Sequence, residues 1–371
     1  MAKHHYVPEW YQQRFIAQDE RELYRLFLKP REVPVSGGLL KQLPNPPKRK
    51  APGALFFERD LYTTRFFGHA NSDIETHLFG KIDSDGAVIV KALVENDERI
   101  LFPNFLSLFD FIDAQKLRTP KGLDWLRTRF PYVTGSELLI QMQQVRRAHC
   151  TMWVEAAREI VSADESSIKF IISDHPVTIY NPACFPGSPQ CQYPLDPPIT
   201  LKGSQTIFPL DLNRCLIFTN LEYAENPALS KRQLLTQRTN ARYFDTTIAR
   251  ADAFVRTHNL TDGEVATINY IIKRRAHQYV AGPNAESLYP EKHIGTTHWS
   301  KLANLLIPRD EMWRFGGEIF VRHKDGSIDA QDKFGRRPRT ATEQQKAENE
   351  MMRMQEVVEE ALAKHRAERR Q

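Results

Sequence analysis

Two adjacent histidines near the N-terminus, His4 and His5, are the residues whose type and spacing best suit chemistry. Imidazole, with an ordinary pKa of about 6.5, serves general acid–base catalysis and metal ligation. Neighbouring residues on an extended segment point to opposite faces, so one histidine can face a pocket while the other packs or orients a group. Both are candidate catalytic residues, and Arg14, in the aromatic and basic stretch that follows, is a candidate for binding substrate. A purely structural role for both histidines is the alternative.

A second polar group stands where a buried strand is expected to end. The apolar run 168–173 is typical of a strand, and Asp174 and His175 follow it directly, ahead of Pro176. Strand ends often display site residues, and the proline restricts the direction of His175. Asp174 is therefore a candidate catalytic residue that orients a histidine or binds a metal, and His175 is a candidate for binding substrate. A simple turn, in which Asp174 caps the backbone before the proline, is the alternative.

Gln115 and Arg118 lie three residues apart at the polar end of the apolar segment 105–118. Residues at this spacing share one face of a helix. Arg118 is a candidate catalytic residue, because a guanidinium holds a phosphate or carboxylate through two parallel hydrogen bonds. Gln115 is a candidate for binding substrate beside it. The alternative for Arg118 is a favourable cation at the C-terminus of a helix that ends before Pro120.

The metal is unknown from the sequence, although a divalent cation is a candidate cofactor. Glu75 and Asp83 would lie about 80° apart around a helix, and paired carboxylates are ligands for divalent metals. A break in that helix at residues 83–86, or a solvated helix face, is the alternative. The chain has no Walker A, GxGxxG, GxSxG or HExxH motif. This argues against ATPases, Rossmann dehydrogenases, α/β-hydrolases and zincins.

The composition is typical of a globular protein. The chain has 371 residues, of which 41% are hydrophobic and 26% charged, enough for one large or two ordinary domains. A net charge of +5 permits an anionic partner such as nucleic acid or a nucleotide without requiring one. With no long apolar run and no secretory signal, we expect no membrane partner and a cytoplasmic location. The four cysteines form no CxxC pair and are expected to be free thiols.

The order of elements predicts an α+β fold that is predominantly helical with a small mixed or antiparallel sheet. Strands are expected at 22–28, 55–64, 168–173, 177–180 and 215–218, and a hairpin at 318–328. Helices are expected across 72–161 and 228–280, with a capping box at 134–137.

We expect three parts along the chain. Residues 1–283 would form a single α+β domain, with a mobile proline- and glycine-rich loop near 29–54 whose basic cluster 48–50 contacts a phosphate backbone or solvent. Residues 284–338 would form a C-terminal extension that contains the hairpin. Residues 339–371 read as an exposed helical tail with a thin apolar stripe, which offers a surface for a partner or packs on the body.

Several short motifs of this chain resemble a bacterial family known as domain of unknown function 4238. The resemblance extends over roughly residues 3–280, and His175 stands where the family pattern more often carries asparagine. It rests on the motifs His4-His5-Tyr6-Val7-Pro8, Arg14-Phe15, Asp60-Leu61-Tyr62, Gln115 with Arg118-Thr119-Pro120, Ser173-Asp174-His175-Pro176 and Phe208-Pro209-Leu210. The family name carries no activity, so the resemblance ranks residues without naming a reaction.

Two hypotheses of function follow. In the first, the protein is a hydrolase, nuclease or phosphodiesterase-like, in which His4 or His5 is general base or metal ligand and Arg118 steadies a phosphate. In the second, it is a non-catalytic binding or interaction module, and the same polar residues form a structural network. Whether the protein is an enzyme at all is left open, with a slight preference for the first hypothesis because the motifs combine His, Arg and Asp.

Overall fold

A computed structural model describes most of the chain in two units, one of residues 1–245 and 256–307 and one of residues 246–255 and 308–371. The residues described are 3–30, 32–35, 39–62, 64–66, 69–71, 79–133, 135–146, 149–154, 156–238, 255–305, 311–315, 318–322, 328–331, 340–346, 348–349, 352–353, 356 and 360. The 3-10 helices η3 (Glu286–Leu288), η4 (Pro290–Lys292) and η5 (Trp299–Leu305) belong to the first unit, and the boundary expected at 283/284 stays a prediction.

The N-terminal histidines lie on a short strand. β1 (Lys3–His5) pairs antiparallel with β6 (Phe57–Arg59), and α1 (Glu9–Gln13) follows it. The strand expected over 55–64 is shorter than predicted, because the chain turns at Asp60 with a φ of 55°. A separate hairpin follows, of β7 (Thr64–Phe66) and β8 (His69–Asn71).

A group of helices follows in the middle of the chain. They are α2 (Gly80–Glu95), α3 (Glu98–Leu117), α4 (Pro120–Arg129), α5 (Ser136–Val145) and α6 (Cys150–Val154). The prediction of helix up to 161 is wrong at its end, because residues 156–162 form a strand that pairs with a distant partner. The predicted capping box is wrong in its cap: Gly135 is the N-cap of α5 and has no side chain to offer, and Thr134 lies outside the described residues.

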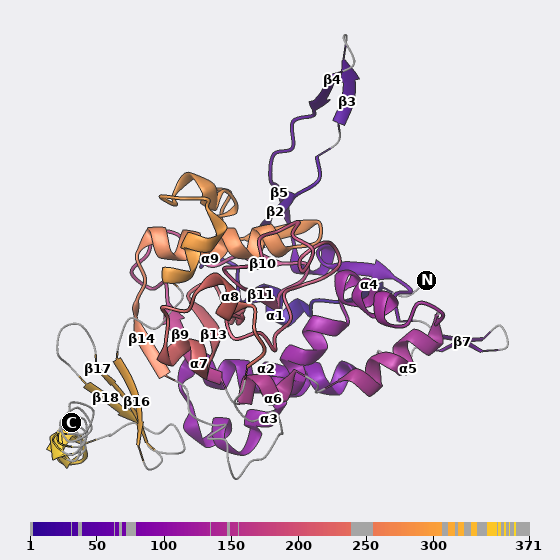
Figure 1. The fold of residues 1–371 in the computed structure, drawn as a ribbon. Coiled ribbons are helices and arrows are strands. Elements are labelled where there is room, and N and C mark those ends of the chain that lie inside the picture. The colour runs from indigo at the N-terminus through magenta and orange to yellow at the C-terminus, as the bar shows by residue number, and fades with distance from the viewer. Residues whose placement is uncertain are drawn as a thin grey trace. The chain divides into compact units, whose positions relative to one another are not determined.

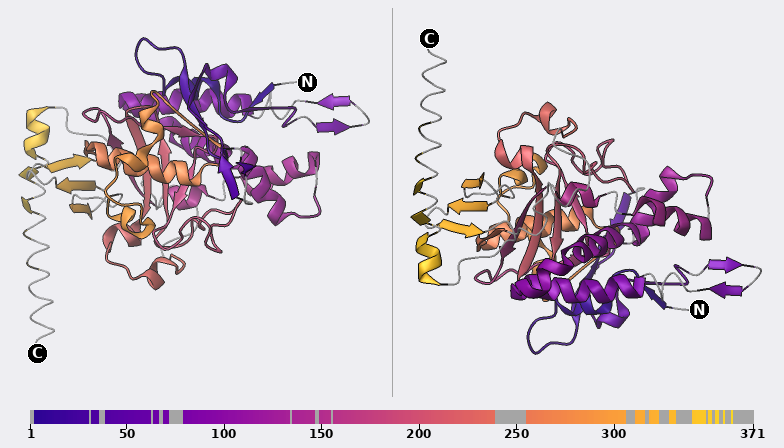
Figure 2. Two further views of the ribbon diagram at one scale, coloured as in Figure 1. Left: turned by 90° about the horizontal axis from the view of Figure 1, so that it is seen from above. Right: turned by 90° about the horizontal axis from the view of Figure 1, so that it is seen from below.

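The larger sheet has the order β11-β12-β13-β9-β14, and its first four strands pair antiparallel. Its strands are β9 (Ala156–Ser162), β11 (Thr178–Tyr180), β12 (Gln205–Pro209), β13 (Arg214–Asn220) and β14 (Val255–Asn259). One face carries Phe208 and Phe218, and their rings contact Tyr11 of α1, Phe109 of α3 and Trp153 of α6. Helices α1, α3 and α6 thus pack on one face of this sheet; Figures 1 and 2 show helices beside it.

A four-stranded antiparallel sheet, in the order β10-β15-β2-β5, positions most of the site described below. It consists of β10 (Ile172–Ser173), β15 (Tyr279–Gly282), β2 (Leu23–Phe27) and β5 (Lys48–Lys50). Helix α9 (Asp262–Arg275) leads directly into β15. The helix predicted across 228–280 is therefore interrupted by β14 and ends at Arg275, and α7 (Leu221–Glu225) and α8 (Lys231–Leu234) precede it.

Part of the stretch expected to be a mobile loop, 29–54, forms strands, and its mobility stays a prediction. β3 (Glu32–Val35) and β4 (Leu39–Gln42) form an antiparallel hairpin that projects from the β2–β5 end of the sheet (Figure 1). The described residues after it form β5 and the 3-10 helix η1 (Pro52–Ala54).

The second unit contains a three-stranded antiparallel sheet of β16 (Glu311–Phe315), β17 (Glu318–Arg322) and β18 (Ile328–Gln331). The predicted hairpin over 318–328 is confirmed by the β17–β18 pairing, although its expected turn at Asp325 lies outside the described residues. The described residues of the C-terminal tail beyond Thr340 are helical.

The α+β class is confirmed, and the strand pairings of the described residues, apart from that of β9 with β14, are antiparallel. Helix outweighs strand, at 42% and 20% of the chain. Within the described part of the chain, no helix has the length and apolar character needed to cross a membrane.

Candidate functional site

His4 is buried in the body of the first unit. Its Nδ1 accepts a hydrogen bond of 2.9 Å from the backbone N–H of Tyr62, and the two rings stack 5.5 Å apart. Burial lowers the pKa of His4, against an opposing influence of Asp60. Because Nδ1 accepts this hydrogen bond, we assign the proton of the neutral imidazole to Nε2. The same bond connects the His4-His5 motif to the Asp60-Leu61-Tyr62 motif, and both carry the family resemblance.

Arg118 is fully buried and binds in several directions at once. Its two terminal nitrogens donate to the Asp83 carboxylate at 3.0 and 2.8 Å, and its Nε donates to the carbonyl of Tyr6 at 3.1 Å. Gln115, with its amide oxygen turned toward the guanidinium, accepts from Nε at 2.9 Å. The bidentate fork predicted for a phosphate is therefore occupied by Asp83, and Arg118 joins α2, α3 and the N-terminal segment.

The junction between α3 and α4 brings Arg118 close to a second polar group. Thr119 caps α4 by accepting from the Gly122 N–H at 3.2 Å. A Cβ at Gly122 would lie 2.5 Å from the carbonyl oxygen of Leu117, so only glycine lets α4 begin this close to α3. Lys116, Arg118 and Lys121 all lie at this tight junction between α3 and α4.

A chain of hydrogen bonds runs from this junction through His175. Thr119 Oγ1 lies 2.7 Å from His175 Nδ1, and His175 Nε2 lies 3.2 Å from an Asp196 carboxylate oxygen. Because the carboxylate can only accept, we assign the imidazole proton to Nε2 and the Thr119 hydroxyl as donor to Nδ1. The order hydroxyl–imidazole–carboxylate resembles a nucleophilic triad, but Thr119 has no exposed surface. We therefore interpret the hydrogen bonds from Thr119 through His175 as a structural support that orients the Asp196 carboxylate.

Asp196 gathers three cations, and we name these four residues with His175 the Asp196 cluster. Lys116 Nζ donates to Asp196 at 2.8 Å and Lys121 Nζ at 2.7 Å, and Arg275 Nη2 donates to the same carboxylate. Arg275 Nε is buried and has no hydrogen-bond partner. Lys116 and Asp196 have the most exposed side chains of the cluster, 12% and 10%, so solvent reaches its edge there.

The Asp196 cluster has more positive than negative charge. Burial raises the pKa of Asp196, but the three cations outweigh it and hold this pKa well below its usual range. Burial lowers the pKa of Lys121 to about 8 despite the attraction of Asp196, and burial lowers the pKa of His175 to about 3. At neutral pH, His175 is therefore neutral, and the carboxylate of Asp196 contacts three cationic side chains.

Asp174 lies next to this cluster and is fully buried. Its carboxylate accepts three backbone N–H groups, from His277 at 2.8 Å, Gln278 at 2.7 Å and Tyr279 at 2.9 Å. It therefore holds the chain between α9 and β15, far away in sequence, and does not cap the local backbone before Pro176 through these bonds. Burial raises the pKa of Asp174 to about 6, although the three N–H donors and Lys121 oppose the shift.

The pKa of Asp174 predicts a specific dependence of stability on pH. Because its pKa of about 6 in the folded protein exceeds the ordinary 3.8, the folded state holds this proton more tightly. The stabilising contribution is present below pH 3.8 and is lost as the pH rises through 6. We expect the stability advantage of the natural protein over Asp174→Asn, measured by urea unfolding, to shrink between pH 4 and 7. An advantage that grows over this range would show that the N–H donors dominate.

His277 and Tyr193 form the more exposed border of the cluster. Their rings stack 5.2 Å apart, and the Tyr193 hydroxyl donates to Asp124 at 2.5 Å. Burial lowers the pKa of His277 to about 4, with Lys29 and Lys121 acting in the same direction. His277 Nε2 accepts a hydrogen bond of 2.9 Å from the Gln278 amide, so the imidazole proton is on the buried Nδ1, which has no hydrogen-bond partner. Tyr193 is 48% exposed. His277 is thus a neutral base beside a cationic pocket.

The structure joins most of the predicted site residues and separates two. His4, Gln115 and Arg118 are linked through Tyr62, whose hydroxyl donates to the Arg118 carbonyl at 2.6 Å. His5 lies on the other face of β1, where its Nε2 is 3.2 Å from Glu9 and its ring contacts Phe57. Burial lowers the pKa of His5, with Glu9 opposing.

Arg14 lies away from these residues, beside the turn that follows β12 of the larger sheet. Its Nε donates to the carbonyl of Leu210 at 3.0 Å, and a terminal nitrogen is 3.7 Å from Asp211. These contacts join the motif after α1 to the turn after β12, so the described contacts of Arg14 are with the protein itself.

Sequence reasoning missed four of the five residues of the Asp196 cluster, and it also missed His277 at the border of the cluster. The four are Lys116, Lys121, Asp196 and Arg275. A weak signal exists for Lys121, which follows the Thr119-Pro120 pair that had already been singled out. Asp196 is an isolated acid in the proline-rich loop 181–200, and no local pattern marks it.

The same loop contains two of the four cysteines, and the thiol of Cys191 donates to the backbone carbonyl of Cys184 at 3.3 Å. The prediction of free thiols is confirmed for all four cysteines.

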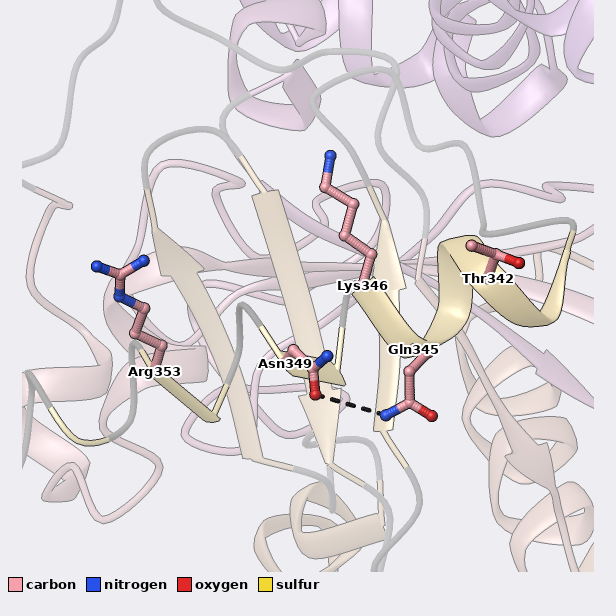
Figure 3. A pocket seen from close by; sticks show the side chains of 5 residues that line it. All are labelled: Thr342, Gln345, Lys346, Asn349 and Arg353. Atoms are coloured by element: carbon pink, nitrogen blue, oxygen red, sulfur yellow. Dashed lines mark hydrogen bonds between the residues drawn. The ribbon is translucent and has the colours of Figure 1, made fainter.

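Two other features, a hollow on the C-terminal helix and the groups of metal-ligating residues, provide no better candidate site. Figure 3 shows a shallow hollow on the C-terminal helix, lined by Thr342, Gln345, Lys346, Asn349 and Arg353. These side chains come from one exposed helix face, and the bond from Gln345 to Asn349 at 3.4 Å is an ordinary i,i+4 contact. Among the described residues, no group of three or more His, Cys, Asp and Glu is arranged to hold a metal; Glu75 lies outside them, and Asp83 binds Arg118.

Comparison with known proteins places the resemblance at the N-terminal part of the chain. No curated protein and no solved structure matches the sequence. The match to a family model ends at residue 149, so it includes His4, Arg118 and Lys121 but not Asp174, Asp196 or Arg275. Over residues 3–149, the chain resembles the family described as a protein of unknown function (DUF4238).

Proposed function

We propose that the protein is a hydrolase, nuclease- or phosphodiesterase-like, in which the Asp196 cluster binds a phosphate group of nucleic acid or a nucleotide. The observation that carries the proposal is the convergence of Lys116, Lys121 and Arg275 on one carboxylate. A buried excess of positive charge is costly unless an anion balances it. Arg275 Nε, buried without a partner, is a further donor for that anion.

Hydrolysis of a phosphodiester needs cations for the charge that develops on phosphorus and a group that takes a proton. The Asp196 cluster would supply the cations. His277, two residues after Arg275, is the best-placed base, because it is neutral and its unprotonated nitrogen is Nε2, which accepts from the Gln278 amide in the resting protein. His277 Nε2 would accept a proton from the attacking water in place of its bond from the Gln278 amide, while the new P–O bond forms and the P–O bond to the leaving group breaks. The leaving oxygen would take a proton from solvent.

A non-catalytic binding module is the second candidate, and a specific observation favours it. The three buried residues expected to do chemistry, His4, Arg118 and Asp174, each bind internal partners. In this alternative, the network only fixes the N-terminal segment on the core, and anion binding at the cluster serves recognition. A divalent metal and a partner for the C-terminal helix stay predictions under either candidate.

A hydrolysis screen separates the two candidates. Purified protein is incubated with bis(p-nitrophenyl) phosphate and with labelled RNA, single-stranded DNA and duplex DNA, with and without EDTA. We expect cleavage by the natural protein, a loss of at least about 100-fold in His277→Ala, within the usual range for a general base, and a comparable loss in Lys121→Met. Lys273→Met is the matched control, because Lys273 is on α9 but binds Glu291 outside the cluster.

The outcomes assign the residues as well as the reaction. Cleavage that survives in His277→Ala but disappears in folded His5→Ala would return the role of base to the N-terminal motif. EDTA sensitivity would establish metal dependence. No cleavage of any substrate would overturn the hydrolase proposal and favour the binding module.

A further inference from the structure

One face of the four-stranded sheet combines cations with aromatic rings. Tyr279 of β15 is the cross-strand partner of Phe27 of β2, with their rings 5.1 Å apart, and the Arg25 guanidinium lies 4.6 Å from the centroid of the Tyr279 ring. Lys48 of β5 is the cross-strand partner of Arg25. Directly paired residues and residues two apart on a strand share a face, so these four side chains form one surface, which we name the basic–aromatic face.

The basic–aromatic face continues toward the Asp196 cluster. His277 precedes Tyr279 by two residues, and it stacks on Tyr193. Lys29, which follows Phe27 by two residues, has its Nζ 5.4 Å from the centroid of the Tyr193 ring. Lys29, Lys48 and Tyr193 are exposed, and Arg25, Phe27, His277 and Tyr279 are partly exposed. Arg25 Nε has no hydrogen-bond partner.

Three carboxylates border this face, and the buried Asp174 among them accepts from the backbone N–H groups of His277, Gln278 and Tyr279. Asp124 accepts from the Tyr193 hydroxyl and pairs with Arg127. Glu58 lies near Asp124 and Arg127, and burial with repulsion from Asp124 raises the pKa of Glu58. The face itself has three cations, Arg25, Lys29 and Lys48, alternating with rings.

We propose that the basic–aromatic face binds a single-stranded nucleic acid and leads its phosphate backbone to the Asp196 cluster. Single-strand sites combine a cationic track for the backbone with aromatic side chains on which bases stack. An isolated nucleotide would need only the cluster, whereas an oligonucleotide would engage Lys48, Arg25 and Tyr193 along the sheet. The inference rests on the proposed function in that it names the substrate class of the same site.

Equilibrium binding tests this inference without any reaction. Fluorescence anisotropy is measured with 12-nucleotide single strands of DNA and of RNA and with a 12-base-pair duplex, over a series of salt concentrations. We expect the natural protein to bind a single strand more tightly than the duplex. Tyr193→Ala should weaken binding about ten-fold or more, the range for loss of one stacking platform. The double variant Lys29→Ala/Lys48→Ala should lower the salt slope by about 1.4.

Two matched controls remove similar groups elsewhere. Tyr132→Ala removes a tyrosine that is 95% exposed between α4 and α5, and Lys91→Ala removes an exposed lysine of α2. Both controls should bind as the natural protein does. Equal losses in controls and face variants, preference for the duplex, or no binding at low salt would overturn the inference.

The same measurement keeps this inference apart from the proposed function. Tight single-strand binding without cleavage supports the face and contradicts the hydrolase. Cleavage of bis(p-nitrophenyl) phosphate without oligonucleotide binding supports the hydrolase and contradicts the face. The ratio of RNA to DNA affinity then identifies which strand the face prefers.

Discussion

Replacing Arg118 with methionine is expected to lower the free energy of unfolding by about 3–5 kcal/mol, the cost of breaking a buried ion pair on one side. The substitution leaves the Asp83 carboxylate without its bidentate partner and removes the donor to the Tyr6 carbonyl. It also removes the guanidinium 5.2 Å from the centroid of the Phe79 ring. Urea unfolding of the natural protein and Arg118→Met measures the difference.

Two controls sharpen the expectation for Arg118. The double variant Asp83→Leu/Arg118→Met removes both charges, so it should lose less stability than Arg118→Met alone. Arg214→Met breaks the more exposed pair with Asp164 and should cost about 1 kcal/mol or less. A cost for Arg118→Met as small as that for Arg214→Met would show that Arg118 is not a structural clamp, and would return it to the candidates for binding phosphate.

Removing the carboxylate of Asp196 is expected to lower the free energy of unfolding by a similar amount. Unlike the loss in Arg118→Met, this loss should be partly reversed by inorganic phosphate. Asp196→Ala leaves Lys116, Lys121 and Arg275 facing one another without their shared counterion, so we expect a loss of about 3–5 kcal/mol. Inorganic phosphate should restore part of that loss, because an anion bound between the cations takes the place of the carboxylate. Melting temperature against phosphate concentration measures both effects.

The test of this reversal depends on a comparison with a surface acid and with an inert salt. Asp164→Ala removes a carboxylate that is 44% exposed, and it should change stability little and respond to phosphate as the natural protein does. Chloride at the same ionic strength controls for screening. If phosphate and chloride stabilise Asp196→Ala equally, the cluster has no specific affinity for a phosphate-type anion.

Local periodicity made part of the site predictable. The spacing of Gln115 and Arg118 predicted a shared helix face, and the two side chains are in contact at the end of α3. The strands around 23–27 and 214–220 were also expected from their apolar patterns. These features depend on neighbours within one turn or one strand, which is the information that a single sequence carries best.

Long-range pairing made the rest unpredictable. Asp196 meets Lys121 and Arg275 across 75 and 79 residues, and no local pattern marks such an encounter. The segment 156–162 has residues that favour a helix, but pairing with β13 makes it a buried strand. Asp83 resembled a solvated or metal-binding acid until the fold placed it on Arg118.

The central claim of this account is that the Asp196 cluster is a phosphate site. Isothermal titration of the natural protein with inorganic phosphate, beside Lys121→Met and Lys273→Met, tests it most directly. The account predicts binding by the natural protein and by Lys273→Met, and a loss of at least about ten-fold in Lys121→Met, as expected for a hydrogen bond to a charged group. Absence of binding in the natural protein, or equal affinity in all three, would contradict the claim.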